Sequence, residues 1–403
     1  MKSLAIKIGK ALGALKDEGL LQGGRRIVAG FLGMFRRVGS GDILFITGGA
    51  GAGASALYRC HHQREELEQH GFECSFTVQD NPWLVSYARK FKVFIFHRPL
   101  MDAKMKKFVA AIKERKGKII FETDDLLFDP QYLSQADYLK NISPLEMPLY
   151  VGGLGAELLN DPYVETCVTT TVFLAKILEA KGKQVFVSTN KLSDADLALA
   201  EKLNAARGKL RKQGEKSEVV IGYFSGTASH DKDFATVAGV LTRILEKHPE
   251  VKLKIVGPLK VGSEFEKFGN RVEHTPFVDR ERHFQNVASV DINIAPLEVG
   301  NPFCEAKSEL KFFGAGILGV PTIAAATQVF RDTIADGIDG FVAHSEEEWE
   351  NKLEGLIVGQ DLRMRLGGRA RTKSLERYTN KNSSNEAYYL CMLRFVYGEK
   401  CKK

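Results

Sequence analysis

Short runs of apolar residues alternate with longer amphipathic stretches along most of this chain. The run at 42–47 predicts a buried strand, because consecutive apolar residues there lead into a glycine-rich segment. Later apolar runs in the first half follow stretches with helical periodicity, and this β-α alternation predicts a parallel sheet with right-handed crossovers. The further strands expected are 74–78, 93–96, 118–122, 167–169 and 185–187, and the helices are a segment ending at 69, 83–90 and 103–116.

A second α/β pattern begins at residue 219, after a polar helical stretch at 194–218. We interpret that stretch as a linker between two domains, at 41–193 and 219–380, and we expect the last helix, at 381–403, to pack back on the first domain. The strands expected here are 219–224, 252–256, 272–274, 291–295, 322–325 and 339–342, and the helices are 234–247, 282–287, 346–358 and 361–378. Ligands of such sheets bind beyond the carboxyl ends of the strands, so the interdomain cleft is the expected site.

Length and charge support this two-domain interpretation. A chain of 403 residues exceeds one ordinary hydrophobic core, and 44% hydrophobic with 27% charged residues is typical of a globular protein. The formal net charge is +7, but residues 1–40 hold eight lysines and arginines against two acidic residues. The rest is close to neutral, which argues against nucleic-acid binding. The six cysteines lack a CxxC pair or zinc-ligand spacing, as expected of reduced thiols in a cytosolic enzyme.

The basic N-terminal arm, residues 1–40, has the pattern of an amphipathic helix. Its apolar residues at helical spacing are Leu4, Ile8, Leu12 and Leu15. A second apolar run, at 27–35, is bracketed by arginine pairs and is about half as long as a bilayer-spanning helix. We therefore expect residues 1–38 to lie on an anionic membrane surface. The alternative is a helix docked on the protein's own body or on a partner.

The segment 301–325 combines two lysines with an apolar flank. After a Pro-Phe turn, a helical pattern places Lys307 and Lys311 one turn apart, and a Gly-Val-Pro sequence ends the helix. Free N–H groups, the helix dipole and two ammonium groups would together bind an anion. A solvated lysine pair on a surface helix would show the same spacing. Phe312 and Phe313 indicate deep packing, so we expect the lysines to line a cleft.

A glycine-rich loop, GGAGAGAS at 48–55, follows the first strand. It lacks the Lys-Ser/Thr of a phosphate-binding P-loop and the acidic residue about 20 positions on that a dinucleotide site requires. Gly51 and Gly53 would instead let a ligand approach backbone N–H groups, although a plain tight turn has the same composition. Arg59, in the next helix, would either reach the cleft or pair with a glutamate at 65–66.

Polar residues also follow the first strand of the second half, in the sequence YFSGTASH at 223–230. Ser225, Gly226 and Thr227 at a strand end suit phosphate or hydroxyl ligands, and His230 could donate to one. A turn followed by a helix N-cap explains Ser225 and Thr227 equally well, and His230 alone is also explained as an ordinary exposed residue.

Ionisable residues end two strands of the first half. His97 and Arg98 follow one strand, and Asp124 and Asp125 follow another, so we expect all four at one cleft. Adjacent carboxylates point apart in an extended chain, which disfavours a shared metal ion. We therefore expect Asp124 to accept hydrogen bonds or to act as a general base. A helix-capping acid pair is the structural alternative.

The motifs of the second half together resemble the C-terminal domain of a GT-B glycosyltransferase of the GT4-like class, which transfers sugars from nucleotide donors. The sequence at 222–234 is similar to a strand-loop motif of bacterial surface-polysaccharide transferases, and 307–321 is similar to the donor-binding helix. Asp-Gly-Phe-Val at 339–342 resembles the turn that follows it. The resemblance covers about residues 41–380 and implies an α/β GT-B fold, with two Rossmann-like domains facing a central cleft.

The resemblance is incomplete on the donor helix. The family commonly places a glutamate that holds the donor ribose where this chain has Gly314, and another where it has Ala306. Glu305 or Glu309 would have to substitute, although Glu309 would face another side of the helix. A non-catalytic scaffold that keeps the fold is therefore one alternative function, and a nucleotide-sugar 2-epimerase-like enzyme is another.

The resemblance implies a retaining, metal-independent glycosyltransferase that needs no cofactor. Lys307 and Lys311 would neutralise the departing diphosphate, and Asp124 would be the third catalytic residue. The implied donor-binding residues are Ser225, Gly226, Thr227, His230, Glu305, Ser308 and Glu309. The implied acceptor or cleft residues are Gly51, Gly53, Arg59, His97, Arg98 and Asp125. The partners would be a nucleotide sugar and a glycan or lipid-linked acceptor, in the cytoplasm or on the inner face of the cell membrane.

Overall fold

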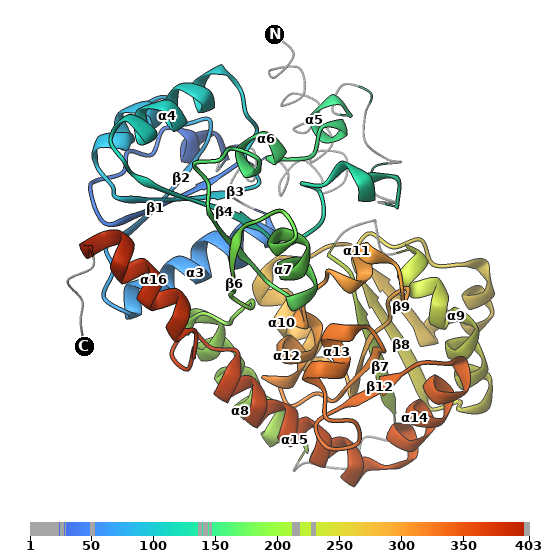
Figure 1. The fold of residues 1–403 in the computed structure, drawn as a ribbon. Coiled ribbons are helices and arrows are strands. Elements are labelled where there is room, and N and C mark those ends of the chain that lie inside the picture. The colour runs from blue at the N-terminus through green and yellow to red at the C-terminus, as the bar shows by residue number, and fades with distance from the viewer. Residues whose placement is uncertain are drawn as a thin grey trace. The chain divides into compact units, whose positions relative to one another are not determined.

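The computed structural model describes residues 24, 28, 30–48, 53–135, 139, 144, 147–211, 218–226 and 231–398 of the chain. They form two compact units, each of them an α/β structure (Figure 1). The first unit comprises Met1–Lys191, Ala306–Ser308 and Ser383–Lys403, and the second comprises Leu192–Glu305 and Glu309–Asn382. Within the described residues, no helix has both the length and the apolar character that crossing a membrane requires.

A six-stranded, all-parallel sheet forms the centre of the first unit, in the order β2-β1-β3-β4-β5-β6. Its strands are β1 (Ile43–Thr47), β2 (Cys74–Val78), β3 (Val93–His97), β4 (Lys118–Thr123), β5 (Thr166–Thr169) and β6 (Gln184–Val187). All residues of β1 and β3 are buried, as expected for strands covered by helices on both faces. The parallel sheet predicted for this half is confirmed.

Helices connect these strands. After β1 come α2 (Ala54–Ala56), the π-helical η1 (Leu57–His62) and α3 (Gln63–Gln69), and after β2 and β3 come η2 (Leu84–Arg89) and α4 (Ala103–Glu114). The connection from β4 to β5 contains η3 (Pro130–Gln135), α5 (Pro148–Val151) and α6 (Ala156–Leu159), and α7 (Val172–Glu179) precedes β6. Asp102 begins α4 by accepting the N–H of Met105, a side-chain N-cap.

The C-terminal helix α16 (Glu386–Tyr397) packs on the core of the first unit. Its Tyr388 and Met392 are fully buried in the same apolar cluster as Ile43 and Phe45 of β1. The end of the chain therefore belongs to the unit that begins it.

The second unit contains another six-stranded parallel sheet, in the order β12-β11-β10-β7-β8-β9. Its strands are β7 (Val219–Phe224), β8 (Val251–Val256), β9 (Val272–Thr275), β10 (Ile292–Ala295), β11 (Thr322–Ala325) and β12 (Phe341–Ala343). Its helices are α8 (Asp194–Arg211), α9 (Asp231–Lys247), η6 (Ser263–Arg271), α10 (Arg280–Ser289), α11 (Pro302–Glu305), α12 (Leu310–Gly316), α13 (Gln328–Thr333), α14 (Glu346–Val358) and α15 (Gln360–Arg377). The second parallel sheet is thus confirmed as well.

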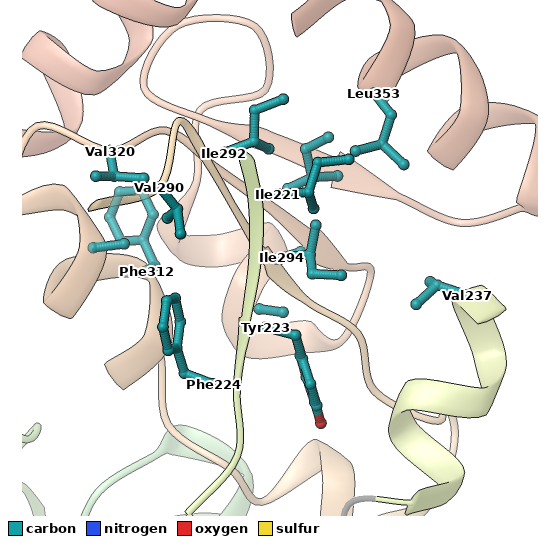
Figure 2. Packing of buried hydrophobic residues seen from close by; sticks show 14 of the residues in the cluster. Ile221, Tyr223, Phe224, Val237, Val290, Ile292, Ile294, Phe312, Val320 and Leu353 are labelled. Carbon is teal, nitrogen blue, oxygen red and sulfur yellow. The ribbon is translucent and has the colours of Figure 1, made fainter. Parts of the chain in front are cut away.

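Side chains of β7 pack against helices on both faces of this sheet. Neighbouring residues of a strand point to opposite faces, and Tyr223 and Phe224 do so in Figure 2. The ring of Tyr223 contacts Phe234 of α9, with centroids 5.1 Å apart, and that of Phe224 contacts His283 of α10 at 5.6 Å. The sheet is therefore buried between two helical layers, as its continuous apolar sequence predicts.

Helix α8 differs from the linker expected at 194–218. Arg207 donates to the carbonyl oxygens of Leu318 (2.9 Å) and Val290 (2.8 Å), which follow α12 and α10. These bonds hold α8 on the second unit, so the described part of this stretch belongs to that unit. Its high charge arises partly because its side chains satisfy carbonyl groups at the ends of other helices.

The single helix expected after the Pro-Phe turn is wrong. Two short helices, α11 and α12, occupy this segment, and residues 306–309 between them are not helical. Nδ2 of Asn190 donates to Oγ of Ser308 (2.9 Å), and Ala306–Ser308 groups with the first unit. A tertiary contact therefore interrupts a sequence whose local pattern is helical.

Candidate active site

The carboxyl ends of β1, β3 and β4 bring polar residues of the first unit together. Oγ1 of Thr47 lies 3.0 Å from Nδ1 of His97, and Oγ of Ser55 lies 2.9 Å from Nε2 of the same ring. Ser55 donates its proton to Asp124 (2.6 Å), so it accepts from the Nε2–H group of His97. Nε2 of His97 therefore carries a proton. This arrangement does not suit Ser55 as a nucleophile, because His97 donates to it instead of taking its proton.

Arg98 lies beside two carboxylates. Its Nη2 is 2.5 Å from an oxygen of Asp124 and 2.5 Å from an oxygen of Asp125. Burial opposes the ionisation of Asp124, but the Arg98 charge and the groups of His97 and Ser55 outweigh it and lower the pKa of Asp124. Burial raises the pKa of Asp125. The Arg98 charge lowers this pKa and the Asp124 charge raises it, and the net effect is an increase. Asp124 is therefore an anion suited to accepting hydrogen bonds, and a weak general base.

The backbone near Arg98 requires a glycine in the loop after β1. A Cβ on Gly48 would lie 1.9 Å from the carbonyl oxygen of Arg98, which itself has a left-handed φ of 48°. Gly48 also donates its N–H to the carbonyl oxygen of His97 (2.9 Å). Gly51, which we expected at a ligand, lies outside the described residues, and Gly53 is exposed at the start of α2.

Arg59 lies in the core of the first unit. Its side chain is 1% exposed and donates to Glu122 (2.5 Å), to the carbonyl oxygen of Ser188 (2.8 Å) and to Oδ1 of Asn190 (3.1 Å). The structure therefore contradicts both the cleft position of Arg59 and its pairing with a glutamate at 65–66. Burial raises the pKa of Glu122, although the Arg59 charge acts in the opposite direction. The sequence separation of 63 residues explains why Glu122 was missed.

Lys311, in the first turn of α12, extends over an aromatic ring of the second unit. Its Nζ is buried and lies 4.3 Å from the centroid of the Tyr223 ring. Nδ2 of Asn293 donates to the carbonyl oxygen of Lys311 (3.1 Å), which links α12 to β10. Phe312 and Phe313 are fully buried, so the deep packing predicted for this flank is confirmed.

Lys307 is not a helical neighbour of Lys311. It is half-buried in the non-helical link between α11 and α12, and this link groups with the first unit. The prediction of two ammonium groups one helical turn apart is therefore wrong. Helix α12 has only seven residues and begins after Glu309 without a side-chain cap, so the argument from a helix start concerns Lys311 alone.

The two glutamates considered for the donor ribose have structural partners. Both oxygens of Glu305 accept backbone N–H groups, from Gly300 (3.0 Å) and Gln328 (2.9 Å). Glu309 is 3% exposed and lies near Tyr378, whose pKa is raised by burial and then by the Glu309 charge. The expectation that either glutamate holds a donor ribose does not fit these positions.

Gly314 leaves space on the same helix. A Cβ built on Gly314 would meet no atom within 4 Å. Gly314 is three residues after Lys311 in α12, so the two positions share one helical face. A larger side chain would therefore extend into open space beside Lys311.

Ser225 and Gly226 directly follow β7. Ser225 is buried and donates its N–H to the carbonyl oxygen of Val256 (2.8 Å), whereas Gly226 is exposed. Thr227 and His230, the other two residues expected to bind the donor, lie outside the described residues.

One group near the start of α9 was missed from the sequence. Sγ of Cys304 donates to Oδ1 of Asp233 (3.2 Å), and the N–H of Glu298 donates to the same oxygen (3.3 Å). One potential ligand atom from each residue lies within 4.8 Å of the others. The thiol–carboxylate hydrogen bond accounts for this geometry without an ion. No local spacing could have revealed it, because Asp233 and Cys304 are 71 residues apart.

A second missed group lies on α10. Arg280 makes two hydrogen bonds to Asp196 of α8, at 2.5 and 2.6 Å. Burial lowers the pKa of His283 to about 4, and the charges of Arg280 and Lys311 add to this effect. The charge of Asp196, the ion-pair partner of Arg280, acts on His283 in the opposite direction.

Known proteins share this architecture. Residues 207–373 match the family Glycosyl transferases group 1. HepE from Anabaena in complex with UDP has a TM-score of 0.58 and 16% identity, over 87% of this chain and 99% of that chain. Sucrose-phosphate synthase from Thermosynechococcus elongatus has a TM-score of 0.59 and 13% identity, over 87% and 97%. A glycosyltransferase from Rickettsia africae has a TM-score of 0.60 and 13% identity, over 90% and 100%.

None of the curated proteins compared matches this chain in sequence. The low identities mean that the solved structures establish the fold, a GT-B-like arrangement of two Rossmann-like sheets. The family match is in the second unit and includes Ser225, Lys311 and Gly314. The match to the group 1 family thus lies within the second unit, and the chain is a glycosyltransferase.

Proposed function

We propose that this glycosyltransferase takes its sugar from a nucleotide donor and binds the donor diphosphate with Lys311. The observation that carries the proposal is the buried Nζ of Lys311, 4.3 Å over the Tyr223 ring. Arg280 lies in the same region, paired with Asp196, and the charges of Arg280 and Lys311 both act on His283. A diphosphate would supply the charge opposite to that of the Lys311 ammonium group. Lys311 also lies in the first turn of α12, which comes after β10 in the chain. Parallel sheets bind ligands beyond the carboxyl ends of their strands.

The proteins of similar fold suggest a first donor to test. HepE has been crystallised with UDP-glucose, and the catalytic domain of starch synthase IV from Arabidopsis thaliana with ADP and acarbose. We therefore propose a UDP-sugar, with UDP-glucose as the first candidate. ADP is the informative competitor, because it differs from UDP in the base while keeping the diphosphate.

Transfer breaks the bond between the anomeric carbon and the β-phosphate oxygen, and the acceptor oxygen forms the new glycosidic bond while its proton passes to the leaving phosphate oxygen. Negative charge grows on the leaving diphosphate during this step. An ammonium group that is already positioned stabilises this developing charge more than it stabilises the bound donor, and so accelerates the reaction. Lys311 would thereby take the place of a divalent ion. Retention of the anomeric configuration is proposed from the resemblance to the GT4-like class.

We propose roles for further residues of each unit. In the first unit, the Asp124 anion, held by Arg98 and Ser55, would accept a hydrogen bond from an acceptor hydroxyl. The remaining residues proposed at the acceptor are His97 and Asp125. Those proposed at the donor are Ser225, Gly226, Thr227, His230, Lys307 and Ser308.

We propose a glycan or lipid-linked glycan as acceptor. The resemblance to bacterial surface-polysaccharide transferases and the basic arm at 1–40 support this class. Such an acceptor would place the protein peripherally at the inner face of a cell membrane.

Calorimetry and a nucleotide-release assay together test the function. We expect UDP to bind more tightly than GDP, TDP or ADP in isothermal titration. We then expect UDP release from a UDP-sugar to depend on an added acceptor. Conversion of the donor sugar to an isomer without any acceptor would indicate the epimerase instead. Absence of binding by every nucleotide would overturn the proposal.

A non-catalytic scaffold is the second candidate, and Gly314 is the observation that favours it. By the resemblance, Gly314 stands where the family commonly has a ribose-binding glutamate, and the space around it leaves that place open. A scaffold predicts no nucleotide binding at all, whereas a weakened donor site predicts measurable UDP binding. The calorimetry therefore separates these two candidates.

A further inference from the structure

An exposed apolar stripe precedes the sheet of the first unit. The side chains of Val28, Phe31, Leu32 and Phe35 are 58%, 56%, 64% and 48% exposed. Their spacing is that of one face of an α-helix, and residues 30–34 are helical. The rings of Phe31 and Phe35 contact each other, with centroids 5.1 Å apart. The stripe is therefore one continuous apolar face.

The residues after this stripe are attached to the first unit near η2. Nδ2 of Asn81 donates to the carbonyl oxygen of Arg36 (2.9 Å). The guanidinium of Arg37 lies 4.5 Å over the ring of Trp83, which precedes η2. The stripe thus ends next to a defined surface of the unit.

That neighbouring surface is basic. Arg36 and Arg37 are exposed at the end of the stripe. Arg89 and Arg115 are also exposed, and they line a surface cavity between η2 and α4 that contains the single carboxylate of Glu114. Apolar side chains and guanidinium groups therefore occur side by side along the chain and on the adjoining helices.

We propose that this docking face, formed by the stripe and the four arginines, binds the surface of an anionic lipid bilayer. The apolar side chains would enter the headgroup boundary while the guanidinium groups contact anionic headgroups. The proposal extends the function proposed above by naming where a lipid-linked acceptor would be met. Vesicle binding itself does not require that function to be correct.

The charges favour a membrane over a second copy of the chain. Two copies joined through the stripe would place the Arg36 and Arg37 groups of both copies in one interface. Like charges in an interface cost free energy unless acidic groups face them. An anionic bilayer instead supplies both an apolar layer and the opposite charge.

Sedimentation with vesicles tests the apolar part of the docking face. The full chain should sediment with phosphatidylglycerol/phosphatidylcholine vesicles and not with pure phosphatidylcholine vesicles. Phe31→Ser combined with Leu32→Ser should weaken this binding at least ~10-fold, because two large apolar groups are lost. The matched control, Val358→Ser with Met364→Ser, removes side chains that are 75% and 50% exposed in the second unit. It should bind like the unmodified chain.

A second pair of variants tests the basic part. Arg36→Gln with Arg89→Gln should weaken binding to anionic vesicles about 10-fold and reduce its salt dependence, since each basic group contributes binding free energy near the surface. Arg365→Gln with Arg369→Gln, which changes exposed arginines of α15, should leave binding unchanged.

Equal binding by the Phe31/Leu32 variant and the unmodified chain would overturn the proposal. So would a concentration-dependent dimer, seen by analytical ultracentrifugation, that this variant abolishes while vesicle binding persists. Lys311→Ala should bind vesicles normally. Loss of transfer in that variant therefore tests the proposed function, and loss of vesicle binding in the Phe31/Leu32 variant tests the docking face.

Discussion

The polar residues near the carboxyl ends of the strands have different surroundings in the two units. In the first unit, Asp124 is bound by Ser55 and Arg98, and the neighbouring Glu122 is bound by Arg59. In the second unit, Lys311 lies over an aromatic ring and open space adjoins it at Gly314. The network of the first unit supports the fold, whereas α12 of the second unit has space for a larger side chain at Gly314.

The comparison predicts its largest effect at Arg59. Arg59→Ala leaves the buried carboxylate of Glu122 without its cation and should lower the free energy of unfolding of the first unit by ~3–5 kcal/mol. Denaturant unfolding followed by circular dichroism measures this loss. Arg243→Ala, which breaks an exposed ion pair with Glu350, is the control and should cost less than about 1 kcal/mol. Similar losses in the two variants would contradict the buried network.

Substitution of Lys311 should affect activity strongly and stability only weakly, the opposite of Arg59→Ala. Lys311→Ala is expected to reduce the rate of sugar transfer at least ~100-fold, because it removes a charge that stabilises the leaving diphosphate. Its unfolding free energy should change far less than that of Arg59→Ala. Lys267→Ala, at an exposed position of η6, is the matched control. Near-normal turnover of Lys311→Ala would remove the assigned role.

The open space at Gly314 predicts a gain in function. Gly314→Glu should tighten UDP binding about 10-fold, because hydrogen bonds from ribose hydroxyls to a carboxylate are among the stronger ones. Gly314→Ala also improves helix propensity but offers no carboxylate, so it should leave UDP affinity unchanged. Isothermal titration of both variants makes the comparison. Equal affinities would show that the ribose lies elsewhere.

A smaller effect concerns pH. The pKa of His283 falls from its ordinary 6.5 to about 4 in the folded chain. As pH decreases below about 6.5, the unfolded chain therefore binds a proton at His283 before the folded chain does, and stability decreases until about pH 4. His283→Gln should show a weaker decrease over this range in urea unfolding at several pH values. An identical pH dependence would mean that His283 does not titrate as described.

The smallest expected effect is that of metal removal. Transfer activity should be unchanged after dialysis against EDTA, because Lys311 would carry the charge that a divalent ion supplies elsewhere. Cys304→Ser would then bind and turn over donor normally in the presence or absence of Mg²⁺. Activity that disappears with EDTA and returns with a metal ion would direct attention to Asp233, Glu298 and Cys304.

The strands were predictable because their signal is local. The apolar run of β1 and the run of β7 each stand between amphipathic segments, and parallel sheets bury such strands on both faces. Phe312 and Phe313 likewise predicted the deep packing of α12, and both are fully buried. Periodicity in a short window was sufficient for these features.

The prediction of a helix at Lys307 was wrong because a contact distant in sequence decides the conformation there. Residues 306–309 follow a helical pattern, but Ser308 accepts a hydrogen bond from Asn190, 118 residues away in sequence. The predictions for Arg59 were wrong for the same reason, because its partner Glu122 lies on β4, 63 residues away in sequence. In each case a distant residue decided a conformation that the local pattern described differently.

The amino-acid sequence by itself determined two α/β halves and the positions of chemical groups at strand ends, because hydrophobic periodicity and strand boundaries depend on neighbouring residues. Only the tertiary structure decided which of these groups meet: Ser55 with His97 and Asp124, Arg59 with Glu122, and Lys311 with Tyr223. The physical reason is that hydrogen bonds, ion pairs and ring contacts act over a few ångströms of space. Packing of the sheets and helices sets those distances, and separation along the chain does not.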